Sequence, residues 1–385
     1  MPITYPYQQY QGVWTLSQAS DAIAQGKWPV PPAPHLYGWG YNGTGGLGLG
    51  NTTFYSSPKQ VGSLSNWSLI ATGGNFNSFI KTDGSLWTVG QNDSGQLGFG
   101  NLTSYSSPKQ VGSLNNWKYV ADGNNFTINI KTDGTLWSWG SNSVGQLGLN
   151  NTTKYSSPKQ VGSLTNWLSI ACGIYNVTAI KTDGTLWSWG NNNYGQLGTG
   201  NVTNYSSPKQ VGALTNWSKI SNGNYHSLAI KTDGTLWAWG YNGNGCLGVG
   251  NITSYSSPKQ VGSLTNWLNI SAGSYFTLAI KTDGSLWGWG GDEYGQLGFG
   301  NITKYSSPKQ VGSLTTWSSI SGGYYYSVAI KTDGTLWAWG YNGSGQLGIG
   351  NITPYSSPKQ VGSLTTWTTL SSGSGSGSTL AIAIT

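Results

Sequence analysis

The residues of this sequence that are best suited to chemistry are tyrosines and asparagines, and the chemistry they suit is recognition rather than catalysis. They occur at positions that change between copies of an internal repeat, whereas the residues around them hardly change. Tyrosine offers rigid aromatic area and asparagine offers adaptable hydrogen bonds, a combination typical of ligand-contacting loops. The candidate contact residues are Tyr41, Phe76, Asn125, Tyr175, Tyr194, Tyr225, Tyr241, Tyr275, Tyr294, Tyr325 and Tyr341. Neutral variation at unconstrained loop tips is the alternative interpretation.

Residues that could support catalysis or bind a metal do not form a recognisable motif. The histidines are His35 and His226, and neither has a recurring acid or nucleophile at a useful spacing. Cys172 and Cys246 fall at different repeat positions, which argues against a disulfide, and no Cys/His cluster has the spacing of zinc ligands. The sequence therefore predicts a protein that is not an enzyme and that uses no cofactor and no metal.

The positive charge of the chain does not indicate nucleic-acid binding. The formal net charge is +7, but all 18 basic residues are lysine, and arginine is the preferred residue for phosphate and guanine recognition. The lysines recur once or twice per repeat, so we expect them to be spread around the molecule as solvated, solubilising charges. The sequence also lacks an apolar run long enough to span a membrane, and its first residues do not read as a secretory signal.

Seven copies of a 50-residue unit position the candidate residues, and they fill residues 36–385 with no apparent insertion or deletion. In the copy that starts at Leu186, strands are expected at 186–190, 209–214, 217–220 and 225–231. A two-residue Asp233-Gly234 turn is expected to lead into the next copy. Four antiparallel strands per copy are the content of a propeller blade.

The predicted fold class is therefore all-β, a seven-bladed β-propeller of four-stranded antiparallel blades. The ring is expected to close by pairing of the N-terminal strand at 36–40 with the C-terminal strand at 379–385. A short N-terminal arm, residues 1–35, precedes the propeller at 36–385. Tryptophans at three repeat positions are expected to fill the wedges between blades, with Val89 as an exception at one of them.

The two variable clusters are expected to meet in space. One precedes the fourth strand of each copy and the other follows the next Trp-Gly strand, so both lie opposite the Asp-Gly turn. One flat face of the ring would then display tyrosine, asparagine, serine and glycine in changing combinations. The opposite face would repeat Lys-Thr-Asp-Gly almost unchanged.

The repeat resembles that of the regulator of chromosome condensation family, whose members form seven-bladed propellers. The matching segments are the Asp-Gly turn, Leu-Trp-x-Trp-Gly-x-Asn-x-x-Gly-Gln-Leu-Gly, and the later Pro-x-x-Val and Ala-Ile segments, in every copy. The resemblance implies a protein-interaction module, and in some members nucleotide exchange on a small GTPase. This chain departs from those members because its copies are equal in length, arginine is missing, and the family's histidine before Ser-Leu-Ala survives only as His226.

The arm differs in kind from the repeats. Residues 15–26 are expected to form a short helix, and residues 28–34, Trp-Pro-Val-Pro-Pro-Ala-Pro, to form a stiff polyproline-like spacer. Residues 12–29 read Gly-Val-Trp-Thr-Leu-x-x-Ala-x-x-Ala-Ile-x-x-Gly-x-Trp-Pro, and this pattern resembles a segment of structural proteins of tailed bacteriophages. Trp14, Ile23 and Trp28 are its candidate anchoring residues.

These observations lead to one main functional hypothesis and two alternatives. The main hypothesis is a virion structural protein, extracellular when mature, that is anchored to other virion proteins through residues 1–35. Its variable face would attach to a host-surface glycan or protein, without nucleic-acid binding or membrane insertion. The first alternative is a cytoplasmic propeller that acts as a protein-interaction or GTPase-exchange module. The second is a virion decoration that binds nothing.

Overall fold

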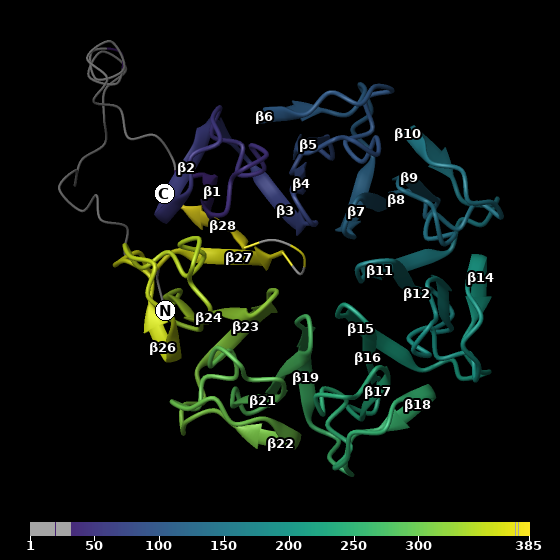
Figure 1. The fold of residues 1–385 in the computed structure, drawn as a ribbon. Helices are drawn as coiled ribbons and strands as arrows, with labels where there is room; N and C mark the ends of the chain where they lie inside the picture. Colours follow the sequence, from purple (N-terminus) through teal and green to yellow (C-terminus); the bar gives the residue numbers. More distant parts are fainter. Residues whose placement is uncertain (1–19, 21–31, 374, 376) are drawn as a thin grey trace.

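Four-stranded antiparallel sheets are arranged as blades around a central axis in the computed structural model (Figure 1). The structure describes residues 20, 32–373, 375 and 377–385. Within these residues 28 strands form seven sheets, which confirms the predicted seven-bladed propeller. Among the described residues, no helix has the length and apolar character needed to cross a lipid bilayer.

Each blade runs from an innermost strand near the axis to an outermost strand at the rim (Figure 1). The innermost strands are β3 (Trp67–Thr72), β7 (Trp117–Asp122), β11 (Trp167–Cys172), β15 (Trp217–Asn222), β19 (Trp267–Ala272), β23 (Trp317–Gly322) and β27 (Trp367–Ser372). The second strands are β4 (Phe76–Lys81), β8 (Phe126–Lys131), β12 (Asn176–Lys181), β16 (His226–Lys231), β20 (Phe276–Lys281), β24 (Tyr326–Lys331) and β28 (Ser378–Ile384).

The third and fourth strands complete the blades. The third strands are β5 (Leu86–Gly90), β9 (Leu136–Gly140), β13 (Leu186–Gly190), β17 (Leu236–Gly240), β21 (Leu286–Gly290), β25 (Leu336–Gly340) and β1 (Pro34–Gly40). The outermost strands are β6 (Tyr105–Gln110), β10 (Tyr155–Gln160), β14 (Tyr205–Gln210), β18 (Tyr255–Gln260), β22 (Tyr305–Gln310), β26 (Tyr355–Gln360) and β2 (Tyr55–Ser65).

The outermost strand differs from the prediction because it contains its proline. β14 begins at Tyr205, so Pro208 lies inside the strand rather than before it. Proline is tolerated there because an outermost strand pairs on one side only and can leave one N–H position without a partner. The ladder between β14 and β13 is irregular between Tyr205 and Lys209, next to the proline.

The turn between the second and third strands is longer than predicted. The backbone N–H of Lys231 donates to the carbonyl of Thr235 at 3.0 Å, which leaves a three-residue loop, 232–234, instead of two residues. Oδ1 of Asp233 accepts hydrogen bonds from the backbone and hydroxyl of Thr235 at 2.9 and 2.6 Å. Gly234 has φ of 76°, where a β-carbon would meet the carbonyl of Thr265. The repeated aspartate therefore serves turn geometry, as the sequence indicated.

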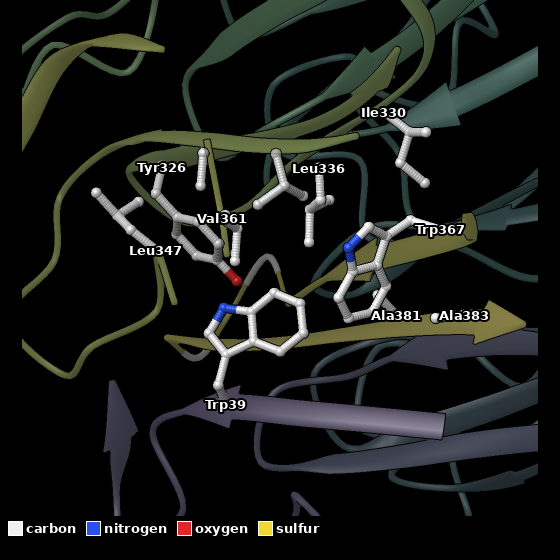
Figure 2. Close-up of a cluster of buried hydrophobic side chains, with 11 residues drawn as sticks. Trp39, Tyr326, Ile330, Leu336, Leu347, Val361, Trp367, Ala381 and Ala383 are labelled. Atoms are coloured by element: carbon white, nitrogen blue, oxygen red, sulfur yellow. The ribbon is translucent and has the colours of Figure 1, made fainter. Parts of the chain in front are cut away.

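Tryptophans fill the wedges between neighbouring blades, as predicted. Trp189 is fully buried, and its indole N–H donates to the carbonyl of Gln146 in the preceding copy at 3.0 Å. Figure 2 shows the equivalent wedge beside the blade that contains both β1 and β28, where Trp39 lies between Tyr326 and Trp367. The ring centroids of Trp39 and Trp367 are 6.1 Å apart in an edge-to-face arrangement. The wedge thus buries large aromatic area, although the buried indole N–H of Trp367 has no partner among the described residues.

The missing tryptophan at Val89 is compensated within the same blade. Phe79 replaces a residue that is alanine in most other copies, and both Phe79 and Val89 are fully buried. The Phe79 ring lies 5.4 Å from the Trp67 ring, where other blades place the ring of the missing tryptophan, as in the 6.0 Å pair of Trp167 and Trp189. The aromatic ring has therefore moved from the third strand to the second while the wedge stays filled.

This exchange predicts a non-additive pair of substitutions. Phe79→Ala alone should lower the free energy of unfolding by about 3–5 kcal/mol, because it leaves a cavity. Val89→Trp alone should cost about 1–3 kcal/mol through overpacking. The double variant should recover most of the stability, since it recreates the alanine–tryptophan pair of the other blades. Thermal unfolding of the four proteins measures the coupling, and additive losses would contradict the proposed exchange.

The ring closes through the two ends of the repeat region, as predicted. β28 lies between β27 and β1 in one sheet, here called the closing blade, which β2 completes. Pairing runs without irregularity from Pro34 opposite Ile384 to Gly40 opposite Ser378. The backbones of Ala33 and Thr385 exchange two further hydrogen bonds of 3.2 Å.

The prediction of seven copies without insertion is wrong at one place. In the first copy, residues 73–75 connect β3 to β4, whereas residues 373–377 connect β27 to β28. The register agrees, because Ile382 pairs with Leu36 as Ile80 pairs with Leu86. The last copy therefore carries two additional residues in a loop, where length is not restrained by strand pairing.

The structure describes only residue 20 of the predicted helix at 15–26. It does not describe the candidate anchors Trp14, Ile23 and Trp28. The anchoring role of the arm therefore stays a prediction.

Candidate functional site

The two variable clusters meet on one flat side of the ring, as the sequence predicted. The backbone N–H of Tyr241 donates to the carbonyl of Tyr225 at 2.9 Å, and Tyr341 makes the same bond to Tyr325. We call this side the loop face, and the side that carries the Asp-Gly turns the turn face. The equivalent backbone hydrogen bond recurs in the other blades. It recurs because the two variable clusters flank the last residue pair of the ladder between the second and third strands.

Six of the predicted contact residues form two equivalent groups of three tyrosines on the loop face. The Tyr194 ring lies 5.1 Å from Tyr225 and 5.4 Å from Tyr241. The Tyr294 ring lies 5.0 Å from both Tyr325 and Tyr341. The two groups use the same three repeat positions, and in each the first tyrosine reaches across to the following blade. We call them the tyrosine triads.

Further tyrosines extend the triads into a larger surface. Tyr275 packs on the first triad, with its ring 6.1 Å from Tyr225 and 5.9 Å from Tyr241. Tyr324 packs on Tyr325 at 4.3 Å and lies near enough to Tyr275 to raise its pKa. Tyr324 was not among the predicted contact residues, although its position changes between copies. The tyrosine surface is defined here as Tyr194, Tyr225, Tyr241, Tyr275, Tyr294, Tyr324, Tyr325 and Tyr341.

The other predicted contact residues lie apart from this surface. Tyr41 packs on Phe54, 4.8 Å between ring centroids, and Asn125 receives only a long 3.5 Å hydrogen bond from Gln96. Tyr175 lies close enough to Tyr225 to influence its pKa but makes no ring contact with it among the described residues.

Phe76 is fully buried and does not belong to the loop face, so its prediction as a contact residue is wrong. Its true equivalents are the buried residues that start the second strands, including Phe126 and His226, whereas the partly exposed variable position of its copy is Asn75. The ring of Phe76 lies under Gly73, where a β-carbon would meet it at 2.4 Å.

In the first two copies the three positions of a tyrosine triad hold a threonine and two amides, Thr44, Asn75 and Gln91. The hydroxyl of Thr44 donates to the carbonyl of Asn75 at 2.8 Å, and the amide of Asn75 donates to Oε1 of Gln91 at 3.1 Å. The Gln91 amide in turn donates to the carboxylate of Asp93 at 2.6 Å. The loop face therefore has an aromatic arc over some blades and a polar hydrogen-bonded network over the first two copies.

Four tyrosines of the tyrosine surface have raised pKa values. Burial and neighbouring tyrosines raise the pKa of Tyr275 to about 12, and burial followed by a hydrogen bond with Tyr324 raises the pKa of Tyr325 further. The charges beside it are paired, because Nζ of Lys304 lies 2.6 Å from Oε1 of Glu293. Burial disfavours ionised Glu293, but its hydrogen bonds from Lys304, Gln296 and the backbone, together with the charge of Lys304, outweigh burial and leave the pKa of Glu293 below its ordinary value. The surface thus offers aromatic area and hydroxyl groups with little net charge.

The prediction that the lysines are solvated holds for those of the outermost strands, such as Lys59, but is wrong for a set of buried lysines at the turn face. Nζ of Lys131 lies 3.8 Å from the ring centroid of Trp137 and 4.8 Å from that of Trp117, and the lysine is 6% exposed. Burial lowers its pKa, and the charge of Asp133 opposes this. Such contacts offset part of the cost of burying an ammonium group. The buried lysines of this kind are Lys131, Lys181, Lys231, Lys281 and Lys331.

Groups that could support catalysis are dispersed and buried. Burial lowers the pKa of His226 to about 4, and its Nε2 lies 3.2 Å from the hydroxyl of Thr277, so a neutral ring fills a core position. Cys172 and Cys246 are free thiols whose pKa values burial raises. Within the described part of the chain, no group of three or more His, Cys, Asp or Glu residues could hold a metal ion.

A cavity of about 310 Å³ lies between two blades away from the tyrosine surface. Trp217 and Trp237 line it together with Leu214 and Pro258. These residues belong to the part of the repeat that hardly changes between copies, so the cavity follows from blade packing. The variable residues gather on the loop face, which is therefore the better candidate for a specific contact.

Comparison with known proteins identifies the repeat. The family model of the regulator of chromosome condensation (RCC1) repeat matches residues 35–80, 83–130, 133–180, 183–230, 233–280, 283–330 and 333–382. A second model of the same repeat matches five segments between residues 118 and 346. No curated protein sequence matches the chain at a significant level.

Solved structures share the fold at low sequence identity. Prp20p of Saccharomyces cerevisiae, described with its binding to Gsp1p and histones, is 21% identical, with 92% of each chain covered and a TM-score of 0.82. Human WBSCR16 is 22% identical over 91% of this chain and 99% of its own, with a TM-score of 0.82. Yeast Prp20 bound to Kap60 is 20% identical over 100% and 96% of the two chains, also with a TM-score of 0.82.

Proposed function

The chain belongs to the regulator of chromosome condensation (RCC1) repeat family, and on that basis we propose that it is a protein-interaction module without catalytic activity. Its partner docks on the loop face through the tyrosine surface. The observation that carries this proposal is the two tyrosine triads, which join neighbouring blades into one aromatic arc. Tyrosine is among the residues that contribute most to binding energy at protein interfaces.

The matched structures support a protein as the partner class. Prp20p is described with its binding to Gsp1p and histones, and the same protein is described bound to Kap60. Nucleotide exchange is not part of the proposal, because this chain contains no arginine and its loops are nearly uniform in length.

Attachment to a host surface as a virion component stays a prediction. It rests on the resemblance of residues 1–35 to bacteriophage structural proteins, and no comparison bears on that resemblance. A glycan ligand for the loop face is an alternative outcome of the experiment below.

Replacing one tyrosine in each triad tests the proposed surface. A partner captured from the source cells by cross-linking, and then purified, should bind the Tyr194→Ser/Tyr294→Ser double variant about 30-fold or more weakly than the wild type. Tyr119→Ser is the matched control, because Tyr119 is also exposed but lies on the innermost strand β7, outside the tyrosine surface. Isothermal titration calorimetry measures the affinities.

The proposal fails if the double variant keeps the wild-type affinity. It also fails if Tyr119→Ser causes the larger loss. Binding to a glycan array that disappears in the double variant would keep the surface but replace the protein partner with a carbohydrate.

A further inference from the structure

We propose that the tyrosine surface binds extended proline-rich segments, and that the chain itself supplies one, residues 28–34 of a second copy. Copies would then associate head to tail. This inference rests on the proposed function, because it names the ligand class of the same surface.

The chemistry of the tyrosine surface matches an extended proline-rich ligand. Tyr194, Tyr294 and Tyr324 are 45%, 41% and 37% exposed, so their rings are available for contact. Among the described residues, the hydroxyls of Tyr194, Tyr225 and Tyr294 have no hydrogen-bond partner and can donate. A polyproline II segment has no internal hydrogen bonds, so its carbonyls accept from outside while its rings pack on aromatic side chains.

The shape of the tyrosine surface also favours an extended ligand. The two triads occupy equivalent positions two blades apart, and Tyr275 lies between them on the intervening blade. The aromatic area is therefore an arc rather than a compact pocket. The only ion pair beside it, in the described residues, is that of Glu293 and Lys304, so the arc does not select a charged ligand.

The chain carries a segment of this chemistry whose C-terminal end lies at the turn face. Residues 28–34 read Trp-Pro-Val-Pro-Pro-Ala-Pro, a composition that favours the polyproline II conformation. Pro34 starts β1 at the position that Gly84 of the Asp-Gly turn holds in another blade, since Leu36 pairs with Ile382 as Leu86 pairs with Ile80. Pro32 is exposed, and the bonds between Ala33 and Thr385 fix the end of the segment at this side.

The same geometry excludes binding within one copy. In the polyproline II conformation residues 28–34 reach about 19 Å from Pro34. β1 itself spans roughly 20 Å from the turn face to the loop face, and a segment must also pass around the rim to reach the tyrosines. The contact must therefore form between copies. Because the contact joins unlike faces, it is heterologous, and successive copies build either a stack or a closed ring.

Sedimentation velocity of the full-length chain over a range of concentrations tests the association. The wild type should form species larger than a monomer as the concentration rises. The Tyr194→Ser/Tyr294→Ser variant and a Pro29→Ala/Pro31→Ala variant should both need at least about ten-fold higher concentration to do so. Tyr119→Ser should associate like the wild type.

A synthetic peptide of residues 26–35 provides the second measurement, by calorimetry against the full-length chain. It should bind the wild type and dissociate the larger species, whereas the same peptide with alanine at its prolines should do neither. A wild type that stays monomeric, or association that survives in the tyrosine variant, overturns the inference.

Failure of this inference is distinguishable from failure of the proposed function. If the peptide does not bind while the tyrosine variant still weakens a purified partner, only the self-ligand is wrong. If the tyrosine variant binds both the partner and the peptide like the wild type, the tyrosine surface itself is wrong.

Discussion

Replacing Asp122 with asparagine is expected to raise the free energy of unfolding at pH 9 by roughly 5 kcal/mol. Oδ1 of Asp122 accepts a hydrogen bond from the hydroxyl of Ser78 at 2.9 Å, but its buried Oδ2 has no partner among the described residues. Burial raises the pKa of the carboxyl from 3.8 to about 8. The folded state thus holds this proton more tightly than the unfolded state, so stability is full below about pH 4 and falls as the pH rises to about 8.

The chain itself shows how an asparagine fits at this position. Asn222 is the equivalent residue of another blade, and it accepts from the hydroxyl of Thr178 at 3.1 Å while its amide donates to the carbonyl of Ala171 at 2.9 Å. An asparagine at position 122 can accept from Ser78 in the same way and carries no charge. The energetic gain is therefore expected mainly above pH 5, where the wild type is penalised.

A second buried carboxyl should contribute in the same direction. Asp292 replaces an asparagine found in the six other copies, where Asn242, for example, donates to the carbonyls of Asn251 and Thr253 at 2.9 and 3.0 Å. Oδ2 of Asp292 has no partner among the described residues, and burial raises the pKa of this carboxyl to about 7. Asp292→Asn should add its gain to that of Asp122→Asn, because distant sites act independently.

Denaturant unfolding followed by tryptophan fluorescence at pH 5 and pH 9 measures these effects. The wild type should lose stability between the two values, and the double variant should lose much less. The reciprocal variant Asn222→Asp is the control, because it should add a new loss of stability at high pH. Equal stability of the wild type at both pH values would show that neither carboxyl carries the expected cost.

Much of the fold could be predicted because the pattern of one blade occurs seven times in the sequence. The strand from Leu186 to Gly190 has the predicted bounds, and the Asp-Gly turn and Trp189 have their predicted roles. Alignment of copies also separated the residues that pack from those that change. The meeting of Tyr225 and Tyr241 on the loop face followed from strand direction alone.

The errors arose where one copy departs from the others. Phe76 was compared with partly exposed residues that belong one position earlier in the repeat, and a shift of one residue in a strand exchanges one face of the sheet for the other. The exchange of ring positions between Phe79 and Val89 needs the contact across two strands, which spacing does not reveal. The two additional residues of the last copy belong to a glycine- and serine-rich loop, 373–377. They were missed because a loop has no periodic pattern of buried residues that would reveal a change in length.

The burial of charged side chains and the contacts between blades could not be predicted from the sequence. A lysine such as Lys131 reads as solvated until two indoles, Trp117 and Trp137, are placed beside it. Likewise, every tyrosine of the surface except Tyr324 was a predicted contact residue, but the triads depend on Tyr194 and Tyr294 reaching the next blade. The sequence therefore predicted which face to inspect, and the structure was needed to find the arc.

Removal of residues 378–385 is expected to abolish cooperative folding of the ring. These residues form β28, the strand between β27 and β1, and the side chains of Leu380 and Ile382 are almost completely buried. Each lost side chain costs about 2–5 kcal/mol, and β1 also loses its whole ladder with β28. The total is on the order of 10 kcal/mol, which is comparable with the stability of a typical domain.

A circular permutant separates the closing strand from the position of the chain ends. An Asn-Gly linker can join Thr385 to Ala33, since their backbones already pair and two residues suffice for a hairpin. New ends between Asp183 and Gly184 then open a different blade without removing a strand. The permutant should unfold cooperatively near the wild-type temperature, whereas the truncated chain should show a broad transition or aggregate when circular dichroism is followed on heating. A truncated chain as stable as the wild type would mean that wedge packing, rather than the strand that joins the two ends, holds the seven blades in a ring.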